Sequence, residues 1–261
     1  MNKDRPLVIG RKKLRSRLFL GTGKFRNKHE LAACIKACGT EVVTVALRRI
    51  DLKRHRENIL EYIPKNVNLL VNTSGARTAR EALRIARIAK AAGYGNWIKV
   101  EVINDSKYLL PDNAETLKAV RMLADEGFVA LPYMFPDLYF AREMAKAGAA
   151  AVMPLGSCIG TGMGLQAKEF IKIIVEEIDV PVVVDAGLGV PSHAAEAMEM
   201  GVDAVLVNTA VATAGAPVKI ARGFALAVNA GRLAYLSAPQ KPLEEASPSS
   251  PLSGFLFEDK K

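Results

Sequence analysis

Short apolar runs alternate with longer amphipathic segments along almost the whole chain. The apolar runs hold four to six residues and are rich in β-branched side chains, a composition typical of β-strands. Eight segments fit this description: Arg17–Leu20, Glu41–Ala46, Asn68–Asn72, Trp97–Val102, Phe128–Tyr133, Ala150–Leu155, Pro181–Asp185 and Ala204–Asn208. The pattern therefore predicts eight strands.

The segments between these strands are Ala-rich and place apolar residues three and four positions apart, as helices do. Cap-like residues such as Asp112 and Ser192 precede some of them, and glycines such as Gly39 and Gly148 follow. Seven helices are expected: Lys28–Ala37, Thr78–Ala92, Asp112–Asp125, Pro136–Ala147, Gln166–Glu177, Ser192–Met200 and Pro217–Ala230.

Strict alternation of strands and helices requires a parallel sheet with right-handed crossovers. Eight such units in a chain of 261 residues predict a closed (β/α)₈ TIM barrel. An open doubly wound sheet is the alternative. In such barrels the reacting groups lie at the carboxyl ends of the strands, so we looked for chemistry there.

Both ends of the chain depart from the alternation. Leu7–Ile9 and Lys13–Leu14 flank Gly10–Lys12 and predict a short hairpin that covers the amino-terminal mouth of the barrel. After the last helix, residues 238–261 are rich in Pro and Ser, which predicts an extended or mobile tail. We therefore expect one barrel domain over residues 1–237 and a flexible tail over residues 238–261.

The composition is that of an ordinary globular protein, with 50% hydrophobic and 24% charged residues. It excludes a disordered chain, a collagen-like repeat and a disulfide-rich miniprotein. No apolar run approaches the roughly 18 residues that a membrane span needs, and the first residues do not read as a signal peptide. We expect a cytoplasmic protein without a membrane partner.

The formal net charge of +9 is concentrated at the amino terminus. Residues 1–28 contain ten Lys or Arg residues and one acidic residue, so the rest of the chain is neutral. Such a segment attracts acidic partners, but it lacks interleaved aromatic residues and a nucleic-acid motif. We do not expect nucleic-acid binding.

The Cys and His residues do not indicate a metal site. Cys34, Cys38 and Cys158 have the spacing of neither a zinc motif nor a disulfide framework. The three histidines do not cluster, and His193, at a helix start, is interpreted as a surface residue. We expect neither a metal ion nor a reactive thiol.

The fourth predicted strand carries two charged residues on one face. Period-two alternation places Lys99 and Glu101 on the face opposite Ile98, Val100 and Val102, so the charged pair points into the barrel. A buried lysine must pair its charge or lower its pKa, and a lowered pKa frees the amine to form a Schiff base. A purely structural ion pair is the alternative.

Loops with glycine or small polar residues follow the sixth, seventh and eighth predicted strands, at the end of the barrel where the carboxyl ends of the strands lie. Asp185 ends the seventh strand and is followed closely by Gly187. Asn208 and Thr209 end the eighth strand, and Gly160 lies in the loop after the sixth strand. Glycines let a ligand approach the backbone, and barrels often hold a phosphate at the last two loops. Together these loops predict a small phosphorylated substrate. Arg48-Arg49 after the second strand suits either an anion or a solvated loop.

Several segments together resemble the bacterial thiazole synthases of thiamin biosynthesis, from about Pro6 to Leu236. The likeness lies in seven stretches: Leu20–Lys24, Val43–Arg49, Asn96–Val102, Met153–Ser157, Val184–Gly187, Asn208–Ala210 and Ala230–Tyr235. The resemblance implies a (β/α)₈ barrel and a lysine imine with 1-deoxy-D-xylulose 5-phosphate. It also implies a homotetramer and a reaction without metal or organic cofactor.

The resemblance assigns roles to individual residues. Lys99 matches the imine-forming lysine, and Glu101 and Asp185 match the acid/base carboxylates. The family's sugar-phosphate contacts match five positions: Gly160, Ala186, Gly187, Asn208 and Thr209. The implied co-substrates are dehydroglycine and a ubiquitin-like sulfur carrier protein with a carboxy-terminal thiocarboxylate, and the implied product is a thiazole phosphate carboxylate.

Some positions differ from the usual family pattern. Ala76 replaces a cysteine, Cys158 a proline, Thr161 a serine and Met163 a glutamine, and the loop after Tyr133 is less polar. These changes bear on the second substrate and the sulfur donor. Two other functions remain alternatives: a Schiff-base aldolase acting on a sugar phosphate, and a catalytically idle barrel that docks a partner through its basic segment.

Overall fold

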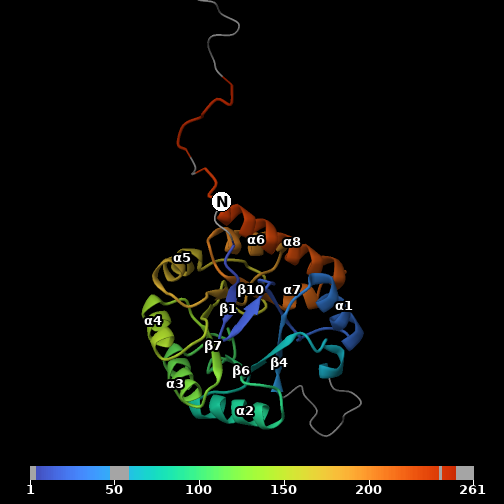
Figure 1. Cartoon of the computed structure of the whole chain (residues 1–261), viewed down its shortest axis with the longest axis vertical. Helices are drawn as coiled ribbons and strands as arrows, with labels where there is room; N and C mark the ends of the chain where they lie inside the picture. The colour runs from blue at the N-terminus through green and yellow to red at the C-terminus, as the bar shows by residue number, and fades with distance from the viewer. Residues whose placement is uncertain (1–3, 48–58, 241–242, 251–261) are drawn as a thin grey trace, which may run out of the picture.

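Eight parallel strands form a closed barrel at the centre of the molecule (Figure 1). The computed structural model describes residues 4–47, 59–240 and 243–250. The strands are β3 (Leu18–Gly21), β4 (Val42–Ala46), β5 (Asn68–Asn72), β6 (Trp97–Val100), β7 (Val129–Met134), β8 (Met153–Pro154), β9 (Val183–Val184) and β10 (Ala204–Val207).

The two strands at the ends of the sheet order, β8 and β9, close the barrel. The order is β8-β7-β6-β5-β4-β3-β10-β9, and parallel bridges join Val152 to Val182 and Leu155 to Asp185. The predicted barrel is confirmed, and the open sheet is excluded.

Helices surround the strands, as Figure 1 shows. Six of the seven predicted helices end within two residues of their expected ends, whereas α8 continues six residues further, and Gly231 in this extension packs closely against Ala195 and Met198 of α6. The helices are α1 (Lys28–Cys38), α2 (Ala79–Ala91), α3 (Asn113–Asp125), α4 (Leu138–Lys146), α5 (Lys168–Glu177), α6 (Pro191–Glu199), α7 (Thr209–Ala212) and α8 (Pro217–Leu236). The connection from β4 to β5 contains a 3₁₀ turn, η3 (Ile59–Tyr62).

The helix starts follow local capping chemistry. Asn27, Thr78, Asp112 and Asp137 each accept a hydrogen bond from a backbone N–H in the first turn of the helix that follows. Ser192 is not a cap, because α6 begins one residue earlier at Pro191, which suits a first helical turn.

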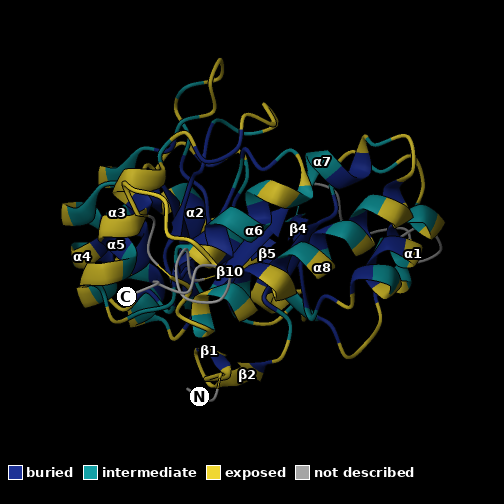
Figure 2. Cartoon of the chain, turned by 90° about the horizontal axis from the view of Figure 1, so that it is seen from above, coloured by how far each residue is buried: buried dark blue, intermediate teal, exposed yellow. Residues whose placement is uncertain are grey.

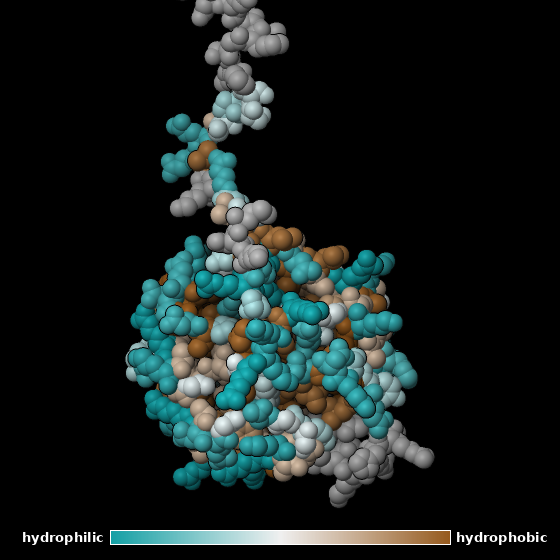
Figure 3. Space-filling view, in the orientation of Figure 1, coloured by the Kyte–Doolittle hydropathy of each residue, from teal (hydrophilic) through white to brown (hydrophobic). Residues whose placement is uncertain are grey.

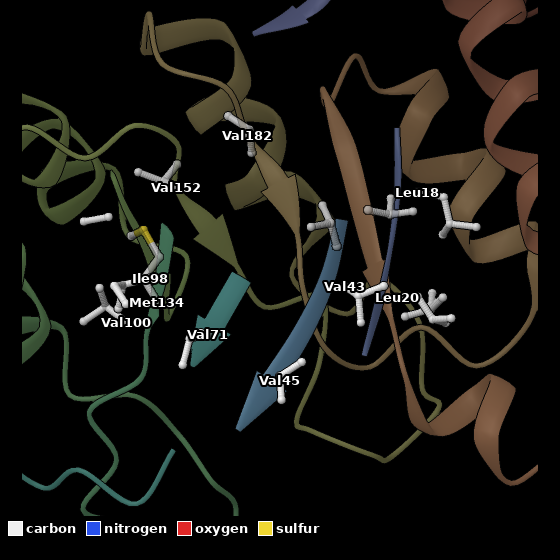
Figure 4. Close-up of a cluster of buried hydrophobic side chains, with 14 of the residues drawn as sticks. Leu18, Leu20, Val43, Val45, Val71, Ile98, Val100, Met134, Val152 and Val182 are labelled. Carbon is white, nitrogen blue, oxygen red and sulfur yellow. The ribbon is translucent and has the colours of Figure 1, made fainter. Parts of the chain in front are cut away.

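Strand alternation divides the buried side chains into two layers. One set points outward against the helices, and Figure 4 labels some of these residues, among them Leu20, Val43 and Val71 on their strands. The other set fills the interior of the barrel, where Phe19, Leu70, Leu131 and Met153 pack together. Ile98 of β6 belongs to the outer layer, as its place in the strand predicts.

The amino-terminal hairpin closes one end of the barrel. Strands β1 (Leu7–Ile9) and β2 (Lys12–Leu14) pair antiparallel, and Leu7, Ile9 and Leu14 pack against the interior cluster. Figure 2 shows this hairpin at one end and α7 at the other. The hairpin is confirmed, with Lys12 in the strand rather than in the turn.

The outer surface is mostly polar, with apolar side chains over α8, including Leu226 and Leu233 (Figure 3). Beyond α8, residues 238–240 and 243–250 are exposed and contain neither helix nor strand. The division into a barrel and a flexible tail stays a prediction. In the described ranges, no helix is both long and apolar enough to cross a membrane. Arg48, Arg49 and His55 lie outside the described residues.

Candidate active site

The main cavity opens at the carboxyl ends of the strands, opposite the hairpin. Its volume is about 620 Å³, and side chains from β4, β5 and β6 line it together with the loops after β3, β8, β9 and β10. It is the end of the barrel at which catalysis was expected.

Lys99 lies inside the barrel between two carboxylates. Its side chain is 7% exposed, and its Nζ atom lies 3.3 Å from Glu101 Oε1 and in closer contact with Asp185 Oδ2. The alternation of β6 brings Lys99 and Glu101 together, whereas closure of the barrel brings Asp185 from β9. The structural ion pair considered from the sequence is therefore present, with a second carboxylate in it.

The carboxylates determine the charge of the amine. Burial lowers the pKa of Lys99, but the negative charges of Asp185 and Glu101 outweigh burial and raise this pKa above its ordinary value. Of the two possibilities open to a buried lysine, the structure therefore shows a paired charge rather than a lowered pKa. Lys99 is therefore an ammonium at neutral pH and must lose a proton before it attacks a carbonyl.

Two neighbours hold this charged group in place. Thr73 Oγ1 donates to the backbone oxygen of Glu101 and accepts from its N–H, both at 2.8 Å. The Tyr133 ring lies 5.4 Å from Lys99 Nζ, and burial raises the pKa of the phenol. Sequence reasoning assigned neither residue a role in the site, although the alternation of β7 places Tyr133 on the inward face.

The loops after β8 and β9 pack against each other through glycines. A Cβ atom on Gly187 would lie 2.0 Å from Ser157 Oγ, and Gly187 has a φ of 80°, so only glycine suits this position. The backbone N–H of Gly164 donates to the Gly187 oxygen at 2.8 Å. Ala186 is also in the left-handed region, with a φ of 61°. The loops thus form one fixed wall of the cavity.

Asn208 contributes a polar atom to the same wall. Its Oδ1 atom is buried and has no hydrogen-bond partner within the described residues. Gly21 makes room for it, since a Cβ atom there would lie 2.6 Å from Asn208 Cβ. A buried polar atom without a partner favours a ligand that supplies a donor.

All eight predicted site residues line this cavity. They are Lys99, Glu101, Asp185, Gly160, Ala186, Gly187, Asn208 and Thr209. Lys24, Thr44 and Asn72 also line it, although they are not among the residues predicted for the site. For Thr44 and Asn72 the available signal was their inward position near the ends of β4 and β5.

The histidine and cysteine residues that the structure describes do not line this cavity. His193 is half-buried rather than on the surface, and its Nδ1 accepts the backbone N–H of Gly189 at 3.1 Å. Burial raises the pKa of Cys34 to about 11 and also raises that of Cys38, so both thiols are inert. Within the described ranges, no group of three His, Cys, Asp or Glu side chains could hold a metal ion.

Comparison with known proteins gives consistent matches over the chain. The family model described as "Thiazole biosynthesis protein ThiG" matches residues 8–251. A thiazole synthase of Pelotomaculum thermopropionicum is 62% identical over 248 residues, covering 95% of this chain and 97% of the relative. One of Heliobacterium modesticaldum is 62% identical over 250 residues, covering 96% and 98%.

Solved structures match as well. The crystal structure of the Amycolatopsis orientalis BexX/CysO complex contains a chain 34% identical to this one, with a TM-score of 0.83, covering 93% of this chain and 100% of that chain. A mandelate oxidase with benzaldehyde, at 17% identity and a TM-score of 0.63, covers 88% of this chain and 77% of its own. The second match shows the fold alone.

Proposed function

We propose that the barrel works through an imine at Lys99, because this chain belongs to the family of the thiazole biosynthesis protein ThiG. The chain is an enzyme of thiamin biosynthesis, a thiazole synthase. The observation that carries the proposed chemistry is a buried lysine in contact with two carboxylates at the carboxyl end of the barrel.

The first step is attack of the Lys99 amine on the C2 carbonyl of 1-deoxy-D-xylulose 5-phosphate. The ammonium first gives its proton to Asp185 or Glu101, and the C–N bond forms as the carbonyl oxygen leaves as water. The proton that the carboxylate accepted is available to that leaving oxygen. The carboxylates thus act as the local base and acid.

The imine makes the neighbouring carbon acidic. Removal of the C3 proton by a carboxylate gives an enaminol, and return of a proton at C2 leaves the carbonyl at C3. Sulfur from the thiocarboxylate of a carrier protein then adds at C3, and the carrier's acyl carbon passes from sulfur to the former C3 oxygen, so that the carrier leaves as a carboxylate and sulfur stays on C3. Dehydroglycine supplies one carbon and the ring nitrogen, which displaces the Lys99 amine from C2. The product is a thiazole phosphate carboxylate.

The substrate's phosphate binds across the cavity from Lys99. Gly160, Ala186, Gly187, Asn208 and Thr209 lie on the wall formed by the loops after β8, β9 and β10. Their glycines leave room for phosphate oxygens near the backbone, and the free Asn208 oxygen accepts a sugar hydroxyl. Binding of the remote phosphate holds the carbonyl at the amine.

The sulfur donor in this proposal is a ubiquitin-like carrier protein. The structure of BexX with CysO supports such a protein partner, since the two barrels share 34% identity over 93% of this chain. Three of the residues that differ from the family pattern, Cys158, Thr161 and Met163, lie in the loop after β8, where Thr161 lines the cavity and Met163 is 60% exposed. A homotetramer in the cytoplasm completes the proposal.

Reconstitution with purified components tests this function. The chain, the sugar phosphate, dehydroglycine generated in situ and a thiocarboxylated carrier should give the thiazole phosphate carboxylate, detected by mass spectrometry. The Lys99→Ala variant should give none. Cleavage of the sugar phosphate into smaller fragments would instead favour an aldolase, and no reaction with any sugar would favour an idle barrel.

A further inference from the structure

The loop between β3 and α1 holds one lysine in an unusual backbone conformation. Lys24 has a φ of 67°, in the left-handed region that residues other than glycine rarely adopt. The loop is fixed on both sides, because Thr22 Oγ1 donates to the Thr44 oxygen at 2.9 Å and Asn27 caps α1. Such conformations persist where the surrounding structure imposes them, and they cluster at functional sites.

The amine of Lys24 lies at the glycine-rich wall of the cavity. A Cβ atom built on Gly160 would lie 3.4 Å from Lys24 Nζ and 3.6 Å from Thr209 Oγ1. Both polar atoms therefore flank one point beside Gly160, and all three residues line the cavity. A single tetrahedral anion at that point could contact both atoms.

The strand order places this group across the barrel from the reacting amine. Lys24, Thr209 and Gly160 follow the ends of β3, β10 and β8, which lie on the same side of the closed sheet. Lys99 is on β6, which is four strands from β10 in either direction around the barrel. An elongated substrate can therefore span the cavity from Lys99 to Lys24.

The charges in the cavity differ between these two ends. Four charged side chains among the described residues line it: Lys24, Lys99, Glu101 and Asp185. Lys99 pairs with both carboxylates, so the cluster of Lys99, Glu101 and Asp185 carries a net negative charge and repels a phosphate. Lys24 is exposed and makes no ion pair within the described ranges, so its charge is available to a ligand.

We propose that Lys24 is the cation that binds the phosphate of the substrate, with Thr209 as its neighbour. This inference rests on the proposed function and adds a residue to it. The Lys24 ammonium donates to a phosphate oxygen beside Gly160, while the carbonyl of the same molecule lies at Lys99. The residue thereby selects phosphorylated sugars and sets the direction in which they bind.

Borohydride trapping with two sugars tests the role of Lys24. The unmodified chain and the Lys24→Met variant are each reduced with 1-deoxy-D-xylulose 5-phosphate or with 1-deoxy-D-xylulose, and the adduct is measured against sugar concentration. Loss of a charged hydrogen bond should raise the half-saturating concentration of the phosphorylated sugar about 10-fold. That of the unphosphorylated sugar should not change, and Lys24→Arg should restore much of the difference.

Lys28→Met is the matched control, since the Lys28 amine lies 5.6 Å from the Tyr62 ring and does not line the cavity. It should trap both sugars as the unmodified chain does. The inference alone would be overturned if Lys24→Met and the unmodified chain had the same half-saturating concentration of the phosphorylated sugar. It would also be overturned if Lys24→Met raised the half-saturating concentrations of both sugars equally. Failure of the unmodified chain to trap either sugar would overturn the proposed function, and this inference with it.

Discussion

At the scale of single residues, the account depends on the charge of Lys99. Alternation along β6 predicts that Lys99 and Glu101 share the inward face, and both are buried there. The contact with Asp185 could not be predicted in the same way, because it depends on how β9 meets β8 across the barrel closure. The two carboxylates together keep the pKa of the amine high.

The pH dependence of imine formation follows from this pKa. Below the pKa of Lys99, the fraction of free amine increases tenfold per pH unit, so trapping of the sugar phosphate should speed up as pH rises from neutrality. Glu101→Gln removes one negative charge, which lowers the pKa of Lys99 and should shift the rate profile to lower pH. The dependence of the trapping rate on pH is measured by stopping the borohydride reduction at set times at a series of pH values. An unshifted profile in Glu101→Gln would contradict the electrostatic argument.

The carboxylates should matter more for the later proton transfers than for imine formation. Asp185→Asn and Glu101→Gln keep the shapes of the side chains but remove the bases, so product formation should fall about 10²–10⁴-fold in at least one of them. Each variant should still trap the sugar phosphate. Mass-spectrometric assays of adduct and product, run side by side, separate the two stages. Full turnover in both variants would leave the carboxylates as structural groups.

Among the secondary-structure elements, the loops that line the cavity lie at one end of the barrel and the β1–β2 hairpin lies at the other. Sequence patterns predict the eight strands because their apolar runs are long enough to recognise, and they predict the hairpin because two short strands flank the expected turn at Gly10–Lys12. The four-residue helix α7 was not predicted, since Thr209–Ala212 is too short to show helical periodicity. The packing of Gly187 on Ser157 could not be predicted from the sequence either, because it joins two loops that are distant along the chain.

That packing should be sensitive to one methyl group. Gly187→Ala would place a Cβ atom 2.0 Å from Ser157 Oγ and force alanine to a φ of 80°, so the free energy of unfolding should fall by about 1–3 kcal/mol. Gly215→Ala is the control, because nothing lies within 4 Å of the added atom. Urea denaturation measures both. Equal free energies of unfolding for the two variants would show that the loops can move apart with little loss of stability.

The hairpin should influence stability but not chemistry. Arg11, Lys12 and Lys13 are exposed at the amino-terminal end, where the Lys12 amine lies 5.6 Å from the centre of the Trp97 ring. Replacing all three by Gln should leave the rate of imine trapping nearly unchanged, because the cavity opens at the opposite end. A large loss of trapping, with the fold intact by circular dichroism, would mean that the basic segment reaches the active site.

At the scale of the whole molecule, closure of the sheet turns eight separate strands into one site. The order of strands around the barrel places Lys99 and Asp185 in contact and sets β10, with Asn208 and Thr209 after it, four strands away from β6. Sequence alone predicts the barrel from its alternation of elements, and it predicts which loops face the cavity. The distances between side chains on different strands require the closed structure.

Peptide mapping of the reduced adduct decides whether Lys99 is the residue that forms the imine. The chain is treated with 1-deoxy-D-xylulose 5-phosphate and borohydride, digested and analysed by mass spectrometry. The added mass should lie on the peptide containing Lys99, and Lys99→Ala should form no adduct. An adduct on Lys24 or on another lysine, with trapping retained in Lys99→Ala, would contradict this assignment.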